Sequence, residues 1–323
     1  MAGDNAVRRR VMAVARIVAS GVILAILVPR VHLSSLLPPG HPHTFLWVAA
    51  ALGVTFVGIV LSAIRWQRVL AALGLEARLS TLVKHYLASL FVGNVLISTV
   101  GGDVLRVSRL SSANHDVPGT FASVVVERLT GWLVLPAITL GALAVNPGLR
   151  HLHRASGLAV TVAIVTLVLL AGLLTAATSK RIGGRLASTE GWRRFTGAIH
   201  LGLARFKERP ALALEVLTAG FAYQLAVMVT AYFASEALGL HVGWTAILAF
   251  FPAVAILQVL PISIGGFGVR EGALVVFLHP LGVTATHAVA LGLLFYAINL
   301  VVSLLGAPAF AVGGRSARTR VLA

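Results

Sequence analysis

Long apolar runs separated by short polar segments make up most of the chain. A helix that crosses a bilayer needs about 20 mostly apolar residues, because about 30 Å of hydrocarbon is crossed at about 1.5 Å per residue. Six stretches meet this requirement: residues 11–28, 44–64, 120–145, 157–177, 211–237 and 284–310. The pattern predicts an all-α polytopic membrane protein with six full spanning helices.

Two further apolar regions, 79–110 and 244–280, are each interrupted in the middle by a Gly-Gly pair. Their second halves are short: a helix from Gly272 to His279 would rise only about 12 Å before Pro280 ends it. We therefore expect two re-entrant hairpins, each entering and leaving the membrane by the same face. Two full crossings in each region are the alternative. A region that crosses twice also begins and ends on the same side, so the positions of the other loops do not distinguish the two arrangements.

Composition supports a membrane location for the whole chain, 1–323, as a single domain. Hydrophobic residues make up 58% of the chain, charged residues make up 11%, and the mean hydropathy is +0.93. A soluble domain of this size could not bury so much apolar surface in one core. The sequence contains no cysteine, which excludes disulfides, a thiol nucleophile and a cysteine-based metal site.

The positions of Lys and Arg predict the orientation of the chain. With the N-terminus inside, 20 cations fall in cytoplasmic segments, Arg65 among them, and only Arg30, Arg150 and Arg154 fall outside. This positive-inside bias places both termini in the cytoplasm. The net charge of +16 is spread over these short segments, so we expect anionic lipid headgroups rather than nucleic acid as its partners. Residues 8–10 are three arginines before an apolar run, as in a signal peptide, but no small-residue cleavage site follows, and we expect an uncleaved first helix.

The cytoplasmic segment 178–210 predicts a basic amphipathic helix that lies on the inner leaflet. Apolar side chains recur near helical spacing and cations lie between them: Phe195, Ile199, Leu203 and Phe206, with Arg193, Arg194, Arg205, Lys207 and Arg209. A surface helix that enforces topology is the simpler interpretation. Direct gating of a substrate by this segment is the alternative.

An internal repeat relates the two broken regions. Residues 95–106 read V-L-I-S-T-V-G-G-D-V-L-R, and residues 259–270 read V-L-P-I-S-I-G-G-F-G-V-R, at an offset of 164. The same offset carries 44–64 onto 208–228 and 120–145 onto 284–309, so the repeat units cover approximately 44–145 and 208–310. An odd number of crossings separates the copies, which predicts an inverted repeat with two oppositely oriented hairpins.

The glycines Gly101, Gly102, Gly265 and Gly266 are the predicted centre of each break. Transporters use broken half-helices near the midplane, where irregular backbone lines a cavity. Glycine permits a tight reversal with positive φ, and a half-helix that begins after it directs its free N–H groups at an anion. Helix packing through small residues is the alternative for such a pair.

Ionisable residues at membrane depth are costly, and they usually face a partner or a cavity. The candidates for binding a lipid phosphate, or for lining its cavity, are Asp103, Arg106, Arg109, Glu127, Arg128, Arg270 and Glu271, with Tyr223, Gln224, Glu236 and Asn299 as weaker candidates. Arg106 and Arg270 follow the glycines by one turn and suit a phosphate. Glu127 could neutralise Arg106 or Arg109, and Glu271 could orient Arg270. Separate structural ion pairs are the alternative to one shared polar cavity.

Histidines cluster in the predicted outer segments, where two H-x-H pairs occur: His41 with His43 and His151 with His153. Neither pair has a carboxylate at ligand spacing, so we expect loop residues and no metal. No hydrolase triad, nucleotide-binding loop or dinucleotide fingerprint is recognisable, and we expect neither a cofactor nor an enzyme activity.

Several runs resemble the lysylphosphatidylglycerol synthase transmembrane (flippase-like) family. They are residues 93–106, the run Val126-Glu127-Arg128-Leu129, residues 260–273, and Arg65-Trp66 with Leu73-Gly74. The resemblance extends over nearly the whole chain and implies a bacterial inner-membrane protein. In this family the membrane domain can be fused to a soluble aminoacyl-transferase domain. Because the chain ends at Ala323 after a short basic tail, we expect the lipid-translocating half without synthase activity.

The leading hypothesis is a flippase-like transporter that moves a phospholipid, an aminoacylated phospholipid or a polyprenyl-phosphate lipid between leaflets. In this hypothesis the two hairpins meet in one cavity, where Arg106 and Arg270 bind the phosphate and Glu127 and Glu271 are counter-ions. One alternative is a non-transporting partner or regulator of an envelope-lipid enzyme, and another is a small-solute or ion transporter. The expected partners are membrane phospholipids, with a second copy of the chain or a lipid-modifying enzyme as protein partner.

The orientation is testable because the chain has no cysteine of its own. His200→Cys, in the predicted cytoplasmic segment, should resist a membrane-impermeant maleimide in intact cells and react after lysis. Leu152→Cys, in a predicted outer loop, should react in intact cells. The reverse pattern would overturn the orientation.

Overall fold

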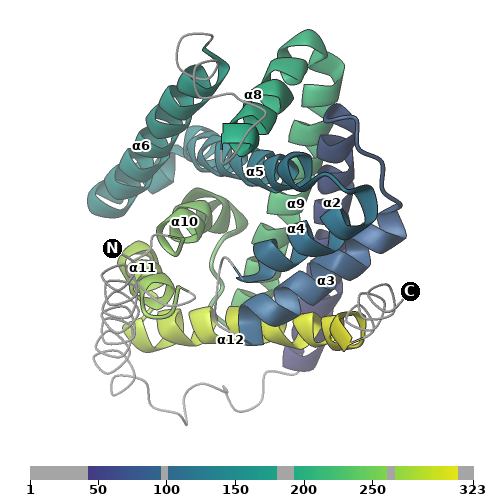
Figure 1. The fold of residues 1–323 in the computed structure, drawn as a ribbon. Helices are drawn as coiled ribbons and strands as arrows, with labels where there is room; N and C mark the ends of the chain where they lie inside the picture. Colours follow the sequence, from purple (N-terminus) through teal and green to yellow (C-terminus); the bar gives the residue numbers. More distant parts are fainter. Residues whose placement is uncertain (1–42, 96–100, 180–192, 260–265, 312–323) are drawn as a thin grey trace, which may run out of the picture. The chain divides into compact units, whose positions relative to one another are not determined.

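The computed structural model describes residues 43–95, 101–179, 193–259 and 266–311, which are helical with no strand among them (Figure 1). In chain order the helices are α2 (Thr44–Ala72), α3 (Leu79–Val95), α4 (Gly101–Asn114), α5 (Val117–Val145), η3 (Pro147–His151), α6 (His153–Thr178), α8 (Arg193–Glu208), α9 (Pro210–Ala237), α10 (Trp244–Leu257), α11 (Val269–Leu278), η4 (His279–Leu281) and α12 (Ala285–Leu304). Residues 306–311 are again helical after a turn at Leu305.

Five helical segments are long and apolar enough to cross a membrane: α2, α5, α9, α12 and Arg154–Thr178 of α6. They correspond to five of the predicted spans, and the sixth, 11–28, lies outside the described residues. Two boundaries differ most from the prediction. Helix α12 ends at Leu304 rather than at residue 310, and α2 continues past residue 64 to Ala72, so Arg65 is helical and not part of a loop.

Each broken region forms two helices that pack against each other, α3 with α4 and α10 with α11. Helix α4 has 14 residues and α11 has 10. At about 1.5 Å per residue they rise about 21 Å and about 15 Å, which is less than a full crossing of about 30 Å. The breaks themselves, 96–100 and 260–265, lie outside the described residues, and the re-entrant arrangement stays a prediction.

The glycines act differently in the two copies. A Cβ atom on Gly102 would lie 2.5 Å from the Ser89 carbonyl oxygen, so the missing side chain lets α4 approach α3 closely. In the second copy Gly266 has φ +78° and Gly268 has φ +81°, a backbone conformation that favours glycine. Gly101 begins α4, and Gly265 lies outside the described residues. The predicted positive φ therefore occurs in the second copy, whereas close helix packing explains Gly102.

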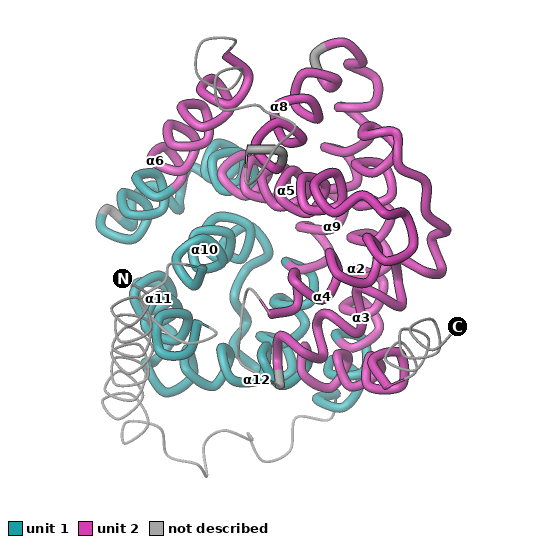
Figure 2. The backbone as a smooth tube through the Cα atoms, in the orientation of Figure 1, with its two compact units in different colours: residues 1–51, 138–162, 228–298 teal, residues 52–137, 163–227, 299–323 magenta. Residues whose placement is uncertain are grey.

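Packing divides the chain into two compact units (Figure 2). Unit 1 contains residues 1–51, 138–162 and 228–298, and unit 2 contains residues 52–137, 163–227 and 299–323. Helices α3 and α4 belong wholly to unit 2, and α10 and α11 belong wholly to unit 1. For each long helix, the end that belongs to unit 2 is the end that the cation count predicts to be cytoplasmic. The first broken region is thus grouped with the predicted cytoplasmic helix ends, and the second with the predicted outer ends.

The predicted amphipathic helix in 178–210 is α8, but its apolar face lies on protein. Leu203 is buried in a cluster with Val69, Val126 and Val216, against which the other apolar side chains of α8 pack: Ile199 and Phe206. Phe195 contacts Phe121 edge-on, with ring centroids 5.4 Å apart. The expectation that this face rests on the inner leaflet is therefore not met, because helices of unit 2 cover it.

The contact at Gly102 predicts a loss of stability on substitution. Gly102→Ala should lower the free energy of unfolding by about 1–3 kcal/mol, as overpacking does, because the new methyl group meets backbone that cannot rotate away. The readout is the temperature at which the detergent-solubilised protein loses its monodisperse gel-filtration peak. Gly172→Ala in α6, where a Cβ atom meets nothing within 4 Å, is the control and should leave this temperature unchanged or raise it.

Candidate functional site

A buried carboxylate, that of Glu127 on α5, collects donors from three other helices of unit 2. Arg65 Nη2 on α2 donates to Oε1 at 2.7 Å, and Arg106 Nη1 on α4 donates to Oε2 at 2.7 Å. Two hydroxyl groups, Ser62 Oγ and Tyr86 OH, donate to Oε1 at 3.2 Å each. The Glu127 side chain is only 1% exposed, so these bonds replace the water that a carboxylate needs.

Arg106 extends this network toward the start of α4. Its Nη2 donates to Asp103 Oδ1 at 2.7 Å, and the other carboxylate oxygen of Asp103 accepts from Arg128 Nε at 2.5 Å. Aromatic rings lie on the guanidinium group, with centroids 4.9 Å away for Trp66 and 4.5 Å away for Tyr86. Charge pairing and cation–π contact together hold Arg106 in one orientation.

Arg65 lies between α2, α5 and α9. Its guanidinium carbon is 5.0 Å from the ring centroid of Tyr223. A Cβ atom on Gly131 would lie 3.0 Å from Arg65 Nη1, and one on Gly220 would lie 3.5 Å from Arg65 Cδ. Gln224 is beside it, with Nε2 donating to the Gly131 carbonyl at 3.4 Å. Two glycines therefore make room for a buried guanidinium group.

The charges of this cluster do not balance. Arg65 and Arg106 are buried, with side chains 4% and 3% exposed, and they share the single buried carboxylate of Glu127. Three of their nitrogens, Nε and Nη1 of Arg65 and Nε of Arg106, are buried and have no hydrogen-bond partner among the described residues. A buried N–H group without a hydrogen-bond partner lowers the free energy of unfolding by about 1–3 kcal/mol, and by more when the group is charged. We call this set, Ser62, Arg65, Tyr86, Asp103, Arg106, Glu127 and Arg128, the arginine cluster.

In unit 1 the equivalent arginine, Arg270, pairs with the glutamate that follows it in the chain. Arg270 donates to Glu271 Oε1 through Nε at 3.0 Å and through Nη2 at 2.5 Å. The second oxygen of Glu271 accepts the backbone N–H of Gly268 at 2.7 Å and so caps the start of α11. The rings of Phe267 and Tyr296 lie 5.5 Å and 5.3 Å from the guanidinium carbon. This pair is neutral and enclosed.

Of the two arginines that the sequence left open as partners of Glu127, the structure pairs Arg106 with it and not Arg109. Arg106 pairs with Glu127, and Glu271 orients Arg270, as expected. Arg109 takes no part in the arginine cluster: its guanidinium group donates to the carbonyl oxygens of Ala309 at 2.9 Å and Phe310 at 2.8 Å. These carbonyls belong to the helical residues 306–311, which follow α12.

Sequence reasoning missed the role of Arg65. An arginine at the end of an apolar run is normally an interface cation, and hydropathy alone assigns it to a loop. The available signal was the spacing of Ser62 and Arg65, which places both side chains on one helix face. Tyr223 and Gln224, weaker candidates from the sequence, lie beside this arginine.

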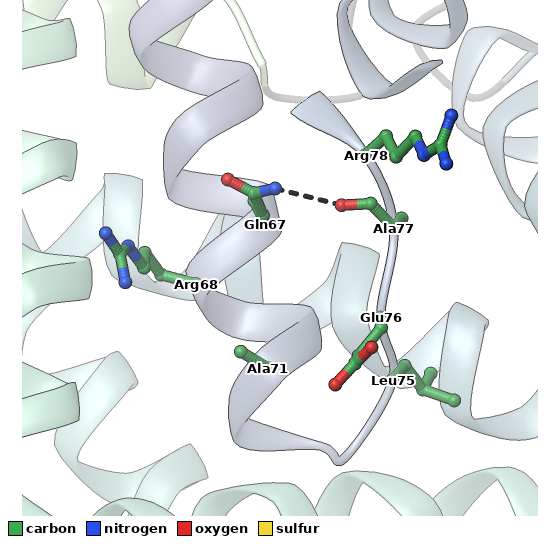
Figure 3. Close-up of a pocket in the computed structure, with 7 residues that line it drawn as sticks. All are labelled: Gln67, Arg68, Ala71, Leu75, Glu76, Ala77 and Arg78. Carbon is green, nitrogen blue, oxygen red and sulfur yellow. Dashed lines mark hydrogen bonds between the residues drawn. The ribbon is translucent and has the colours of Figure 1, made fainter. Parts of the chain in front are cut away.

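Two cavities lined by described residues of unit 2 lie outside the arginine cluster. One, of about 660 Å³, lies where the chain turns after α2 and is lined by Gln67, Arg68, Ala71, Leu75, Glu76, Ala77 and Arg78. The Gln67 amide donates to the Ala77 carbonyl at 2.9 Å and holds the turn, while the side chains of Arg68 and Arg78 point away from each other (Figure 3). The other cavity, of about 320 Å³, is apolar and lies between α5, α6, α8 and α9. Among the described residues no three His, Asp or Glu side chains are grouped to hold a metal ion.

The fold and the arginine cluster define a class: a polytopic helical membrane protein with interrupted helices and a buried, positively charged polar cluster. Comparison with protein families identifies the particular family, because the family described as the lysylphosphatidylglycerol synthase TM region matches residues 13–306. The chain belongs to this family, as the sequence motifs indicated. Membership suggests a lipid-related function in a membrane. A comparison with curated proteins gives no match.

Among the described charged residues of unit 2, Glu127 should give the largest loss of stability when its charge is removed. Glu127→Gln leaves two buried guanidinium groups without their shared anion, and breaking a buried pair in this way costs about 3–5 kcal/mol. The measurement is the midpoint of thermal denaturation in detergent. Glu215→Gln is the control, because Glu215 pairs with Arg68 at 3.2 Å at the surface, where a pair contributes about 0–1 kcal/mol. Equal effects of the two substitutions would contradict this role.

Proposed function

We propose that the protein moves a lipid with a phosphate-bearing headgroup between the leaflets of the bacterial inner membrane, with both termini in the cytoplasm. The observation that carries this proposal is the arginine cluster. Two buried guanidinium groups share the carboxylate of Glu127, and only Arg106 has a second carboxylate, that of the partly exposed Asp103. Three nitrogens of these two arginines have no partner among the described residues. The candidate substrates are phospholipids, aminoacylated phospholipids and polyprenyl-phosphate lipids.

A phosphate group suits this cluster for electrostatic reasons. Guanidinium groups bind phosphate through paired N–H donors, and charge-assisted bonds of this kind are about twice as strong as neutral ones. The N–H groups on Nε and Nη1 of Arg65 have no acceptor among the described residues, so a phosphate oxygen could accept hydrogen bonds from them. In this mechanism Glu127 bridges the two arginines and offsets their mutual repulsion, so both guanidinium groups stay at one site.

The buried location of the cluster matters for transport. A charged headgroup that crosses the hydrocarbon needs compensating charge along its path, because the cost of an unpaired ion there is several kcal/mol or more. Arg65 and Arg106 would supply positive charge, and Asp103 and Glu127 would limit how tightly the headgroup is held. We propose no covalent step for this chain, and the absence of a nucleotide-binding motif favours facilitated or ion-coupled movement.

The pair in unit 1 favours a second candidate function. Because both oxygens of Glu271 are used, by Arg270 and by the backbone of Gly268, this pair needs no ligand to be stable. An ion pair that does not exchange its partners would suit a protein that supports an envelope-lipid enzyme without transporting lipid. Lipid movement and static support therefore make different predictions for Arg270.

Liposomes with a fluorescent phospholipid in both leaflets test the proposal. A membrane-impermeant quencher bleaches the outer leaflet only, unless the reconstituted protein moves the inner lipid outward. Arg65→Gln and Arg106→Gln should each slow this movement about tenfold or more, since a lost charge-assisted bond of about 1.5–3 kcal/mol corresponds to at least that factor. Arg270→Gln should slow it if Arg270 contacts the headgroup.

Arg68→Gln is the matched control, because this arginine is about half exposed and lies outside the cluster on the same helix as Arg65. Rates are normalised to the amount of monodisperse protein that enters the liposomes, which separates transport defects from misfolding. Lipid movement would be refuted if wild-type protein and empty liposomes gave the same bleached fraction with phosphatidylglycerol, lysyl-phosphatidylglycerol and phosphatidylcholine alike. Movement of a small charged dye without movement of lipid would indicate a solute transporter.

A further inference from the structure

The unpartnered nitrogens of the arginine cluster are unequally divided between its two buried arginines. Arg106 donates through Nη1 to Glu127 and through Nη2 to Asp103, at 2.7 Å each, and only its Nε lacks a partner among the described residues. Arg65 donates through Nη2 alone, to Glu127 at 2.7 Å and to Ser62 at 3.4 Å, and both its Nε and its Nη1 lack a partner there. The capacity to bind an anion therefore lies mainly on Arg65.

Two aromatic rings add to the contacts that fix Arg106. The ring centroids of Trp66 and Tyr86 lie 4.9 Å and 4.5 Å from its guanidinium carbon. Trp66 is held in turn by a hydrogen bond from its Nε1 to Ser123 Oγ at 2.9 Å. Tyr86 is held by a hydrogen bond from its hydroxyl group to Glu127 Oε1 at 3.2 Å. A ligand that took Arg106 from its carboxylates would also have to break these contacts, so Arg106 is suited to positioning rather than to binding.

The other groups that contact the guanidinium group of Arg65 come from α5 and α9, and two of them are glycines. A Cβ atom on Gly131 of α5 would lie 3.0 Å from Arg65 Nη1, and one on Gly220 of α9 would lie 3.8 Å from the same nitrogen. The ring of Tyr223, also on α9, has its centroid 5.0 Å from the guanidinium carbon. These groups contact the guanidinium group but accept no hydrogen bond from its Nη1. They cover a charge without satisfying it.

The part of α9 that covers Arg65 packs on α2 and α5 through small residues and one long hydrogen bond. A Cβ atom on Gly58 of α2 would lie 3.5 Å from the Cβ atom of Ala226. The amide of Gln224 donates through Nε2 to the Gly131 carbonyl of α5 at 3.4 Å. Among the described residues no buried ion pair joins α9 to α2 or to α5. Residues of α9 can therefore move away from Arg65 without leaving a buried charge unpaired.

We propose that Arg65 is the arginine that binds the phosphate of the lipid, beneath α9, and that Arg106 is a positioning residue that holds the carboxylates of the cluster. This assignment rests on the proposed function and adds a route to it: the phosphate reaches Arg65 when residues 210–227 of α9 move away from α2 and α5. The described conformation is the closed one, because the Arg65 side chain is only 4% exposed. On opening, charge-assisted bonds from Nε and Nη1 to phosphate oxygens replace the contacts with the two glycines.

Cysteine cross-linking tests the route, because the chain has no cysteine of its own. The Cβ separation at Gly58 and Ala226 suits a disulfide, so Gly58→Cys combined with Ala226→Cys should fix α9 on α2 when oxidised. Native mass spectrometry of the detergent-solubilised full chain measures binding of a short-chain phosphatidylglycerol. The oxidised form should bind it about tenfold more weakly or worse, as expected when a charge-assisted hydrogen bond is lost, and a reductant should restore binding.

Each single cysteine variant is the matched control, since oxidation should leave its binding unchanged. Equal binding by the fully cross-linked and the reduced double variant would overturn the route beneath α9.

Lysine substitutions separate the roles of the two arginines. Arg65→Lys keeps a charge but concentrates it on one nitrogen, so the paired donors are lost and binding should weaken about tenfold or more. Arg106→Lys can still pair with Glu127 and should keep binding within about twofold of wild type. Arg68→Lys is the control on the same helix as Arg65, because Arg68 is about half exposed, and it should leave binding unchanged. Equal losses in Arg65→Lys and Arg106→Lys would overturn the assignment of roles.

Two further probes identify the source of the phosphate. A short-chain diacylglycerol, which lacks the phosphate, should bind wild-type protein more weakly than phosphatidylglycerol, and equal binding would refute a phosphate site. Inorganic phosphate should displace little of the lipid, and full displacement would assign the site to the free anion. Binding with the expected pattern in a protein that moves no lipid in liposomes would refute the proposed function and leave this site standing. Lipid movement by a protein in which Arg65→Lys binds as wild type does would refute this site and leave the proposed function standing.

Discussion

The carboxylate of Glu127 is the constraint on which the structure of unit 2 depends. A carboxylate that is 1% exposed keeps its charge only if donors surround it, and here the donors come from α2, α3 and α4. Each of these helices must therefore present one residue to the same point on α5. Arg65 and Arg106 meet this requirement, and three of their nitrogens still have no partner among the described residues. The proposed binding of a phosphate rests on this surplus of donors.

The buried arginine is neutralised in different ways in the two copies of the repeat, and the sequence shows why. In the second copy Glu271 directly follows Arg270, so the arginine is neutralised locally. In the first copy a valine, Val107, occupies that position, and Arg106 takes its counter-ion from α5. At the repeat offset of 164, Glu127 corresponds to a leucine, Leu291, so the shared carboxylate belongs to one copy only. The two matching sequence segments therefore differ in how their arginine is neutralised.

Helix α8 shows how an amphipathic pattern can be used within a protein. Its apolar side chains, Leu203 and Phe206 among them, face α5, α6 and α9, and between them they leave an apolar cavity whose threonine hydroxyls are all bonded to backbone. Hydrophobic periodicity specifies which face of such a helix avoids water. It does not specify whether lipid or protein covers that face, because both are equally apolar.

The sequence by itself determined the membrane class, five described spans, the two interruptions and the local pair of Arg270 with Glu271. These features depend on local sums of hydropathy or on neighbours in the chain, which sequence displays directly. Only the tertiary structure decided that Arg65 is buried on Glu127 and that Arg109 binds carbonyl groups near Phe310 instead. Such partners lie 62 to 201 residues apart, and which of several arginines reaches a carboxylate depends on how the helices pack, which no local pattern specifies.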